Sequence, residues 1–500
     1  MTDAAGTRKT AEMVFGIVAA VGTPVRFVTN TIEAALKQRG YQTAVLHLSS
    51  YTKAVQLDTP WPEESADEYT RISSLMKRGN ELREKARRGD ILAAFAAAAI
   101  NAQRVGEPQT ALPTSAFILR QLKHPDEVYA LRRIYGDGFH AIGIYCPKKA
   151  RREYLTVKEG MSEPQADDLI GRDENEPPSL GQKFRDTFYL ADVFIEAGFE
   201  NATTIKAQID RFFDLLFGTK IISPHRDEYG MFLAHASALR SSSLARQVGA
   251  AILSQAGEVL AIGTNDVPRY GGGQYWEGEK PDARDHIRGI DVSDLMKADI
   301  VREILQNLIP EWMDLPAADQ ESRIAEAMLK LSHARVMNLT EFTRAVHAEM
   351  EALSAADRIG VSVRDATLYT TTFPCHGCAK HIVVAGITRL VYVEPYPKSL
   401  AIELHNDSIA VEEQEEGDHP KVRFEPFVGI APRRYEALFS TTTPEGTKIR
   451  RKDAAGRVIE GEAYVRISMS DRTYIQREAD AASLLQELIG KAENGAQINL

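Results

Sequence analysis

Apolar residues in the first third of the chain fall into short continuous runs that alternate with stretches of helical spacing. The run MVFGIVAAVG at residues 13–22 predicts a buried strand that enters a glycine turn. Residues 23–40, TPVRFVTNTIEAALKQRG, have helical periodicity that ends at Gly40, and the strand YQTAVLHL follows directly. Strand, turn, helix and strand in this order predict the opening of a parallel α/β nucleotide-type fold.

The same alternation continues to about residue 155. TSAFILRQL and FHAIGIYCP read as strands, and HPDEVYALRRIYG between them reads as a helix. The most apolar run, ILAAFAAAAI at Ile91–Ile100, is well short of the roughly eighteen residues that a membrane span needs, so it predicts a buried helix segment. The N-terminus has no charged-then-apolar signal layout. We therefore expect a parallel α/β domain over residues 10–155 and a cytoplasmic protein without membrane contact.

Three further regions are expected. Residues 156–220 predict a helical linker, in which the charged tract around ENEPP (Glu174–Pro178) forms an exposed loop. Residues 221–432 predict a second domain, which opens with the helix EYGMFLAHASALRSSSLARQ and a hairpin of VGAAILSQAG and EVLAIGTND. Residues 433–500 predict a C-terminal extension with a strand-like EAYVRISM and a final helix, READAASLLQELIGKA, whose apolar spacing suggests packing on a neighbour.

Composition and charge narrow the function classes. The chain has 500 residues, 44% hydrophobic and 26% charged, which suits two or three ordinary globular domains. Its formal net charge of −10 repels polyanions, so any phosphate that it binds must meet a local basic pocket. The three cysteines, Cys146, Cys375 and Cys378, exclude a secreted disulfide framework and indicate a reducing compartment. Cys146 stands alone and is expected to be a plain buried residue.

The strongest chemical signal is the pair of motifs HAE (His347–Glu349) and PCHGC (Pro374–Cys378). H-x-E followed by P-C-x-x-C is the signature of the zinc deaminases. A catalytic zinc takes three protein ligands and keeps one position for water, whose pKa falls from about 15.7 to about 7. His347, Cys375 and Cys378 are the expected ligands of one zinc ion. Glu349 is the expected non-ligand carboxyl that delivers protons to the ring nitrogen and to the departing ammonia.

The spacing of these residues predicts how they meet. Cys375 and Cys378 are three residues apart at the start of a predicted helix, where free N–H groups and the helix dipole favour thiolates. His347 and Glu349 are only two apart, which places them about 200° apart around a regular helix. The metal must therefore lie at a helix end, and we expect two helix N-termini to converge on it, with Pro374 beginning the second helix.

Two other histidines, His376 and His381, lie close to this motif. We expect both of them outside the ligand set, because three ligands are already present. Taken singly, H-x-E is a common pattern and C-x-x-C is more often a structural metal site or a redox pair. Their order, with a strand and a proline before the cysteines, favours the catalytic interpretation.

From Tyr229 to Tyr396 the chain resembles the deoxycytidylate deaminase family. The resemblance rests on SSSLARQVGAAI, GEVLAIGTNDVP, AVHAEMEAL, TLYTTTFPCHGCAKHIVVAGI and TRLVYVEPY. It implies a cytidine-deaminase-like α/β/α sandwich with the zinc helices packed on a central mixed sheet. It also implies that Asn265 contacts the nucleoside and that Tyr396 lies near the bound nucleotide.

Basic residues near these motifs are candidate phosphate contacts. Arg246 lies where the family carries basic residues before its first strand, although a solvated helix-end arginine is the plain alternative. Lys380 and Lys398 are weaker candidates of the same kind. The family often holds a second, structural zinc, but the insertion at about 267–344 has no cysteine, and its His286 and His333 have no partners of the right type. We therefore predict a single zinc.

The N-terminal half resembles the P-loop nucleotide-kinase-like domain of two-domain bacterial antiphage deaminases. The similarity rests on GIVAAVGTP, GNELREKARRGDILAAFAAAAI and FILRQLKHPDEVYALRRIYGDGF. A phosphate-gripping loop needs G-x-x-x-x-G-K-[ST], whereas this turn has Gly16, Gly22 and Thr23 and no lysine. Phosphoryl transfer is therefore not expected. Nucleotide binding by Gly16, Gly22 and Thr23 stays open, and a sensing or autoinhibitory role is our hypothesis for this domain.

The sequence thus predicts deamination of free dCTP, and also of dCMP, to the deoxyuridine forms with release of ammonia. By resemblance this activity would deplete dCTP during phage infection. Three alternatives stay open: a dCMP-only deaminase of pyrimidine salvage, a polynucleotide cytosine deaminase, and a nucleotide-sensing scaffold with a vestigial site. We also expect a homo-oligomer, a dimer or higher, and leave open a regulatory nucleotide or RNA.

Overall fold

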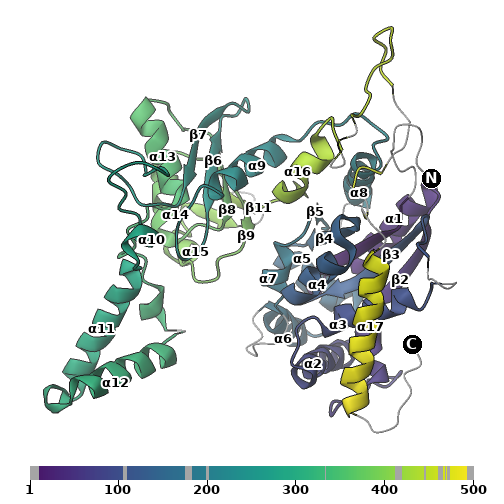
Figure 1. Cartoon of the computed structure of the whole chain (residues 1–500), viewed down its shortest axis with the longest axis horizontal. Coiled ribbons are helices and arrows are strands. Elements are labelled where there is room, and N and C mark those ends of the chain that lie inside the picture. Colours follow the sequence, from purple (N-terminus) through teal and green to yellow (C-terminus); the bar gives the residue numbers. More distant parts are fainter. Residues whose placement is uncertain are drawn as a thin grey trace. The chain divides into compact units, whose positions relative to one another are not determined.

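The computed structural model of the chain describes residues 11–104, 110–174, 183–198, 202–332, 334–411, 419–443, 446, 448–459, 465–467, 469 and 473–492. The chain divides into two compact units (Figure 1). The first unit contains residues 1–228 and 428–500, and the second contains residues 229–427. Both ends of the chain therefore contribute to the same unit.

The first unit is built on a six-stranded sheet in the order β12-β5-β4-β1-β3-β2. Five strands are parallel, and the short β12 pairs with β5 in the antiparallel sense at one edge. The strands of this sheet are β1 (Met13–Ala19), β2 (Gln42–His47), β3 (Ser115–Leu122), β4 (Phe139–Tyr145), β5 (Val193–Glu196) and β12 (Gly429–Ile430). Their parallel arrangement confirms the α/β class expected of the N-terminal half.

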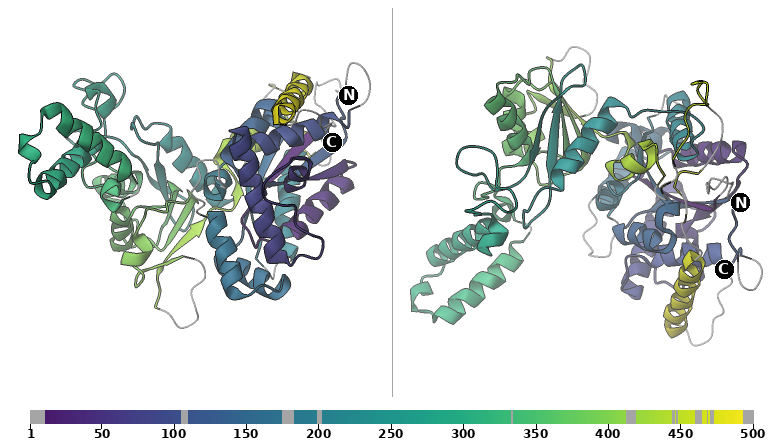
Figure 2. Two further views of the ribbon diagram at one scale, coloured as in Figure 1. Left: turned by 90° about the horizontal axis from the view of Figure 1, so that it is seen from below. Right: turned by 45° about the horizontal axis from the view of Figure 1, so that its top comes forward.

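Helices cover both faces of this sheet (Figure 2). Residues of α1 and α8 share one apolar cluster with β1, β3, β4 and β5, which places these two helices on one face. Helix α3 is buried along nearly its whole length and packs against α4 and α17. The run at Ile91–Ile100 is therefore the buried helix that its composition predicts. The helices of this unit are α1 (Val25–Gln38), α2 (Glu68–Ala86), α3 (Ile91–Asn101), α4 (Pro125–Tyr135), α5 (Lys148–Glu153), α6 (Glu163–Glu174), α7 (Phe184–Phe188), α8 (Ala202–Leu216), α16 (Pro432–Phe439) and α17 (Thr473–Ala492). Shorter helical turns lie at Leu48–Ala54, Gly136–Gly138 and Tyr154–Lys158.

The compact units differ from the predicted division at 156–220 and 433–500. Within the region expected to be a linker, β5 joins the first sheet beside β4, and α6 and α8 pack in the same unit. A strand of four residues is too short to reveal itself by periodicity. After the second unit, the chain returns to the first through β12, α16 and α17. Residues 171–174 of the expected loop end helix α6, and residues 175–178 lie outside the described part, as does half of EAYVRISM.

The second unit is built on a mixed sheet in the order β10-β11-β9-β8-β6-β7. β6 and β7 form the predicted antiparallel hairpin, and β6 also pairs with β8 in the antiparallel sense. β8, β9, β11 and β10 are parallel to one another. The strands are β6 (Gly249–Leu253), β7 (Val259–Thr264), β8 (Thr367–Thr372), β9 (Arg389–Glu394), β10 (Ile409–Val411) and β11 (Val422–Pro426).

Helices pack on both faces of the second sheet, and two of them lie very close to the strands at Gly249 and Gly263. A Cβ atom at Gly249 would lie 2.0 Å from the carbonyl oxygen of Ala234 in α9, and one at Gly263 would lie 2.2 Å from that of Ala348 in α13. Helix α14 shares the apolar cluster of α13. The helices are α9 (Arg226–Ala238), α10 (Asp285–Arg288), α11 (Val292–Leu308), α12 (Ala317–Lys330), α13 (Ala348–Ile359), α14 (His376–Val384) and α15 (Ala401–Leu404), with short turns at Trp312–Asp314 and Arg335–Asn338.

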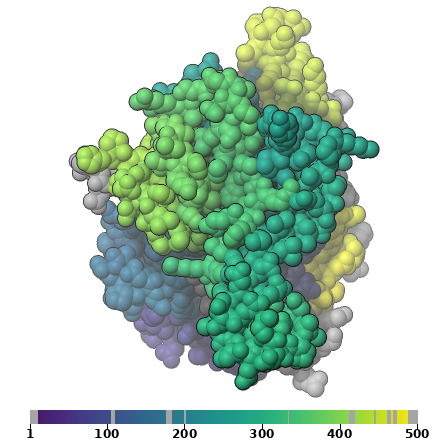
Figure 3. Space-filling model, turned by 90° about the vertical axis from the view of Figure 1, so that its left-hand side faces the viewer, coloured from purple at the N-terminus to yellow at the C-terminus, as the bar shows by residue number. Residues whose placement is uncertain are grey.

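The long insertion before α13 forms a helical arm, defined here as α11, α12 and the turn at Trp312–Asp314. It projects from the sheet in Figure 1 and forms a separate lobe in Figure 3. The arm has a small core of its own, in which Val301, Trp312 and Ile324 are buried. Across the described residues, every helix is too short or too polar to cross a bilayer.

Candidate active site

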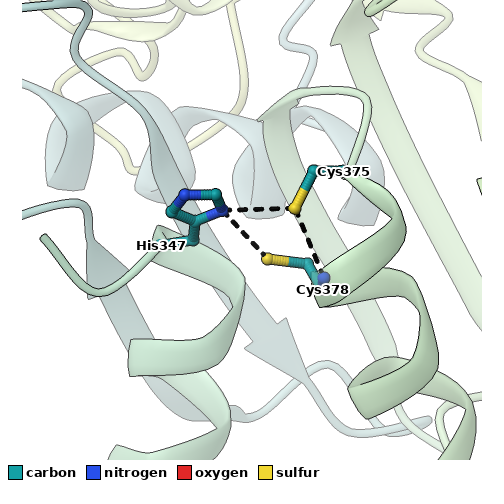
Figure 4. Close-up of side chains that lie close together, drawn as sticks. All are labelled: His347, Cys375 and Cys378. Carbon is teal, nitrogen blue, oxygen red and sulfur yellow. Dashed lines mark hydrogen bonds between the residues drawn. The ribbon is translucent and has the colours of Figure 1, made fainter. Parts of the chain in front are cut away.

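Two helix N-termini in the second unit converge on one point, as the sequence predicts (Figure 4). His347 is the N-cap of α13 and Cys375 is the N-cap of α14, both with extended backbone. The sulfur of Cys375 accepts a hydrogen bond from the backbone N–H of Cys378 at 3.4 Å. Pro374 does not begin this helix, because Cys375 caps it and the first helical residue is His376. The proline instead stiffens the entry to the cap.

The three side chains form a donor set that fits a zinc ion. Nδ1 of His347 lies 3.3 Å from the sulfur of Cys375 and 3.4 Å from that of Cys378. All three donor atoms lie within 4.8 Å of one another. One imidazole and two thiolates are preferred zinc ligands, and three of them leave a coordination position for water. A set of three ligands at helix ends, with both cysteines buried, matches a catalytic site more closely than a four-ligand structural site.

Hydrogen bonds within the cluster shift the pKa values of the two thiols in opposite directions. Hydrogen bonding with Cys378, and then with His347, lowers the pKa of the Cys375 thiol to about 3, although burial opposes this. The pKa of the Cys378 thiol is raised well above its ordinary value, first because it donates to Cys375 and then because it is buried. The metal-free pair therefore shares one proton. Binding of a metal to both sulfurs must release that proton, so metal affinity should rise with pH.

Glu349 lies beside the donor set without being part of it. Its side chain is only 4% exposed, and the hydroxyl of Thr370 on β8 lies 3.5 Å from its Oε1 atom. Burial raises the pKa of the Glu349 carboxyl, while the charge of His347 opposes the shift. A raised pKa makes a buried carboxyl hold a proton more readily, which favours a group that must both accept and donate one in general acid and base catalysis.

The cluster opens into a cavity of about 500 Å³ in the second unit. His347, Glu349 and Cys375 line its inner end. This volume lies within the ordinary range for sites that bind small ligands, about 300–1,000 Å³. Its remaining walls come from the loop before β6, the insertion before α13, the end of β8, and the segments that follow β7 and β9.

The insertion supplies walls that the sequence analysis did not foresee. Its residues in the cavity lining are mostly polar, and they come from the base of the arm and the segment that returns to α13: Asp285, Asp291, Ser293, Asp294, Lys297, Met337, Asn338, Leu339, Thr340 and Thr343. Lys297 is mostly buried and pairs with Asp294 at 3.2 Å. The position of the insertion in the sequence could have predicted this, because an insertion that ends three residues before the His347 motif must lie beside the site.

Four of the five candidate substrate residues line the cavity, namely Asn265, Arg246, Tyr396 and Lys398. The fifth, Lys380, is exposed on α14 and is not among the lining residues. It follows the Cys378 ligand by two positions and therefore faces away from it on the helix.

The amide of Asn265 supports the loop before β6. Its Oδ1 accepts from the N–H of Val248 at 2.6 Å, and its Nδ2 donates to the carbonyl of Arg246 at 2.8 Å. One N–H and one lone pair of this amide remain for a ligand. Arg246 is half-exposed, pairs with Glu394 at 3.2 Å, and lies 5.6 Å from the ring centroid of Tyr396.

The cysteine and histidines outside the donor set take simple positions. Cys146 is buried directly after β4, as expected. His376 and His381 are half-buried on α14 and do not join the metal group. His286 is exposed on α10, and His333 lies outside the described residues. The described ranges contain one group of three or more potential ligands, the one at His347.

The candidate nucleotide residues of the first unit do not form an open loop. Gly16 lies inside β1, where a Cβ atom would meet the side chains of Leu122 and Phe139 at 2.5 and 2.8 Å. Gly22 does lie in the turn after β1, with φ of +84°, but its Cα faces the carbonyl of Arg151. Thr23 is buried beside it.

Side chains of the same chain already bind one N–H group and one carbonyl group of that turn. The carboxylate of Asp173, from the end of α6, accepts the N–H of Val21 at 2.7 Å. The ammonium of Lys123 donates to Asp173 at 2.7 Å and to the carbonyl of Ala19 at 2.8 Å. The N–H group that would hold a phosphate thus holds a carboxylate of the same chain.

Most of the second unit matches a described protein family. Residues 224–394 match the family described as the cytidine and deoxycytidylate deaminase zinc-binding region. This part of the chain is therefore a domain of that family, and its mixed sheet between helical layers is the cytidine-deaminase-like fold that the resemblance implies.

Individual relatives agree on the class. The deoxycytidylate deaminase of Enterobacteria phage T4 is 34% identical over 96 residues, which are 19% of this chain and 47% of the relative. A probable deoxycytidylate deaminase of Drosophila melanogaster is 28% identical over 169 residues, 34% of this chain and 59% of the relative. The chain spans about half the length of the curated relatives that it matches. Among solved structures, the dCMP deaminase of cyanophage S-TIM5 in complex with dCMP and dUMP covers 41% of this chain and 99% of its own, at 17% identity and a TM-score of 0.23.

Proposed function

We propose that this chain is a zinc-dependent hydrolase that deaminates free deoxycytidine nucleotides, dCTP and also dCMP. The observation that carries the proposal is the donor set of the partly buried His347 and the buried Cys375 and Cys378, with the buried non-ligand carboxyl of Glu349 beside it in the lining of a cavity. Either part alone is common in proteins, whereas the combination serves hydrolytic deamination.

His347, Cys375 and Cys378 would hold the metal. When bound, zinc supplies the Lewis acidity that makes water a competent nucleophile at neutral pH. The chain itself contributes the proton chemistry. In hydrolytic deamination the oxygen of water adds to C4 of cytosine, and the bond from C4 to the exocyclic nitrogen breaks. Water gives up two protons in turn, one to the ring nitrogen N3 and one to the departing amine, which leaves as ammonia. A single carboxyl can accept and deliver each of them. We assign both transfers to the buried Glu349, and its raised pKa supports this role.

Basic residues along the cavity support a nucleotide as the substrate. Arg246, Lys297 and Lys398 line it, and each can meet a phosphate oxygen with a charge-assisted hydrogen bond. Asn265 and Tyr396 also line the cavity and would contact the nucleoside. A polynucleotide substrate fits less well with the net charge of −10.

The biological setting is proposed from the sequence resemblance alone. Deamination of dCTP would deplete that nucleotide during phage infection, and the first unit would act as a sensing or regulatory partner that responds to a nucleotide or RNA. Because its β1–α1 turn has no lysine of the P-loop type, we propose binding without phosphoryl transfer. A homo-oligomer is part of the same proposal.

The test uses the purified full-length chain and its Glu349→Gln variant. Zinc content is measured by elemental analysis, and deoxyuridine products are measured after incubation with dCTP, dCMP, CTP and cytidine. We expect about one zinc per chain in both proteins, turnover of dCTP and dCMP by the parent, and a loss of roughly 10²–10⁴-fold in the variant. Zinc-loaded parent protein that turns over neither deoxycytidine nucleotide would refute the proposal.

A further inference from the structure

The segment between α9 and β6 forms part of the cavity wall without being a helix or a strand. We call residues 242–248 of this segment the 242–248 loop. Every residue of the loop except Gln247 lines the cavity, and Arg246 carries the guanidinium proposed to meet a phosphate. Because an irregular segment has no ladder of backbone hydrogen bonds to fix it, its position depends on bonds to neighbouring elements.

Asp266 provides such bonds at the first residue of the loop. Its Oδ2 atom accepts a hydrogen bond from the backbone N–H of Ser242 at 3.2 Å and another from the Ser242 hydroxyl at 3.0 Å. Its Oδ1 atom accepts from the N–H of Val267 at 2.7 Å. Asp266 is only 2% exposed, and a buried carboxylate is costly unless donors bind it. These bonds therefore fix the place at which the loop begins.

The backbone of the same residue binds the segment that enters helix α13. The carbonyl oxygen of Asp266 accepts from the N–H of Val346 at 3.0 Å, and these two residues form an isolated antiparallel bridge. Val346 is followed directly by His347, the N-cap of α13. The side chain of Gln274 supports this junction, because its Nε2 atom donates to the carbonyl oxygen of Asp266 at 3.3 Å and to that of Thr264 at 2.7 Å. Asp266 thus links the loop to a metal ligand through a short path of bonds.

The carboxylate of Asp266 is poorly suited to contact a phosphate itself. Asp266 lines the cavity, but both of its oxygens already accept hydrogen bonds from the chain. Two negative charges at short range also cost Coulomb energy. Arg246, in contrast, attracts a phosphate, and its guanidinium lies 3.2 Å from the carboxylate of Glu394. An effect of Asp266 on the binding of a phosphate must therefore pass through the loop.

We propose that Asp266 is a positioning residue for the nucleotide, which holds the 242–248 loop so that Arg246 can bind the substrate phosphate while the base lies at the metal ligands. The inference rests on the proposed function, since it concerns how a deoxycytidine nucleotide is held in the same cavity. Asp266 acts through Arg246, so its loss weakens nucleotide binding and leaves the proton chemistry of Glu349 intact. The KM for the nucleotide should therefore change while kcat does not.

The experiment is a double-mutant cycle between Asp266→Asn and Arg246→Gln in the full-length, zinc-loaded protein, with dCMP as the substrate. Asparagine keeps the shape of the side chain but has one acceptor oxygen, whereas the two oxygens of Asp266 each accept from a backbone N–H. We expect each single substitution to raise KM about tenfold, because each removes a charge-assisted hydrogen bond. The double variant should have a KM within about twofold of the single variants, since effects within one network are not additive.

Glu258→Gln is the matched control. Glu258 is exposed at the other end of the β6–β7 hairpin, and its carboxylate also accepts from a serine hydroxyl, that of Ser254 at 3.4 Å. This substitution should leave KM unchanged, and Arg246→Gln should still raise KM about tenfold when the two are combined. The control separates the coupling of Asp266 with Arg246 from a general effect of removing a negative charge.

Ser242→Ala covers the case in which Asp266→Asn does not fold. It removes only the hydroxyl and keeps the backbone N–H of Ser242 that also binds Asp266. We expect a smaller rise in KM than for Asp266→Asn, and a smaller rise still when Arg246→Gln is already present. Elemental analysis and thermal denaturation check that each variant keeps its zinc and its fold.

Three results would overturn the inference. They are a parental KM in Asp266→Asn, a fall in kcat at unchanged KM, and additive losses in the double variant, which would mean that Asp266 does not act through Arg246. Failure of the proposed function looks different, because the zinc-loaded parent protein would then turn over neither dCMP nor dCTP.

Discussion

Side chains at the candidate active site differ in how they are supported. The imidazole and the two sulfurs hold one another at 3.3 to 3.4 Å, and Cys375 also caps its own helix. Arg246 and Lys398, in contrast, lie on the outer wall with much of their surface in solvent. The metal ligands are therefore preorganised, whereas the basic residues can adjust to the length of a phosphate chain.

Lys398 lines the cavity and Lys380 does not, so the same substitution at these two lysines should have different effects. Lys398→Gln removes a charge from the cavity lining and should raise the KM for deoxycytidine nucleotides about tenfold with little change in kcat, because one charge-assisted hydrogen bond is worth about 1.5–3 kcal/mol. Lys380→Gln removes the same charge from the exposed face of α14 and should leave KM unchanged. Steady-state kinetics with dCMP and dCTP provide the measurement, and equal effects of the two substitutions would contradict the placement.

Gly263 on β7 packs closely against helix α13. A methyl group at this position would lie 2.2 Å from the carbonyl of Ala348 and 2.4 Å from the N–H nitrogen of Ala352, so Gly263→Ala must push α13 away from the sheet. Overpacking of this kind costs about 1–3 kcal/mol. Because Ala348 lies between His347 and Glu349, the variant should also bind zinc more weakly.

The control for this change is Gly171→Ala. Gly171 is exposed near the end of α6 and has no neighbouring atom within 4 Å of an added Cβ. This substitution should be neutral or slightly stabilising, since alanine favours a helix over glycine by about 1 kcal/mol. Thermal denaturation and zinc titration of both variants distinguish the two outcomes, and a Gly263→Ala protein of parental stability and zinc affinity would show that α13 has room to move.

At the scale of elements, the helical arm is a unit with its own core and a functional base. Lys297 in α11 and Met337 after α12 line the cavity, while the distal parts of both helices are largely exposed. Val301, Trp312 and Ile324 join the two helices. A change in the core of the arm should therefore alter the shape of the cavity wall.

Trp312→Ala tests this connection. The indole is fully buried, and its removal should cost the arm about 3–5 kcal/mol of local stability. We expect faster proteolysis within the arm and a higher KM, with zinc content unchanged because the metal ligands lie on α13 and α14. Met313→Ala is the matched control, as Met313 is adjacent and 80% exposed. Equal protease resistance of the two variants would contradict a separate core in the arm.

At the scale of the whole molecule, the second unit is inserted into the chain path of the first. The returning segment is held by buried charges, in which Arg434 of α16 contacts Asp192 at 3.4 Å and Arg104 binds both Glu12 and Glu478 of α17 at 2.6 Å. A truncation that removes only the residues before the second unit would leave α16 and α17 without these partners. Deletions that test the role of the first unit should therefore keep or remove both of its parts together.

Asp192 makes this arrangement testable by pH. Burial alone would raise the pKa of its carboxyl, but the charges of Arg434 and Arg132 and the N–H of Ala141 outweigh burial and lower the pKa below its ordinary value of 3.8. A group with a lowered folded-state pKa stabilises the fold fully above 3.8 and loses that contribution as the pH falls through the folded value. Acid should therefore weaken the attachment of α16 to the first unit.

We expect Asp192→Asn to lose about 3–5 kcal/mol at pH 7, because it leaves two arginines without their buried partner. Its stability should then depend less on pH below the ordinary carboxyl value of 3.8 than that of the parent chain does. Urea denaturation at several pH values measures both effects. Asp319→Asn, an exposed position on α12, is the control and should follow the parent curve.

Local sequence was sufficient to predict the longer strands of both sheets and the three residues of the donor set, but not the short strands β5 and β12. The strands at Met13–Ala19 and Gly249–Leu253 have strong periodic signals, and the ligands occur within two short motifs whose spacing already requires helix ends. These features depend on residues that are near one another in the chain, which is why a pattern in the sequence can reveal them.

Only the tertiary structure decided which distant residues meet. Asp173 closes the turn at Val21 from 152 positions away, and the insertion supplies part of the cavity wall. The return of the C-terminal segment to β5 is equally invisible in the sequence, because β12 has only two residues. Such contacts follow from how sheets and helices pack, and no local periodicity records them.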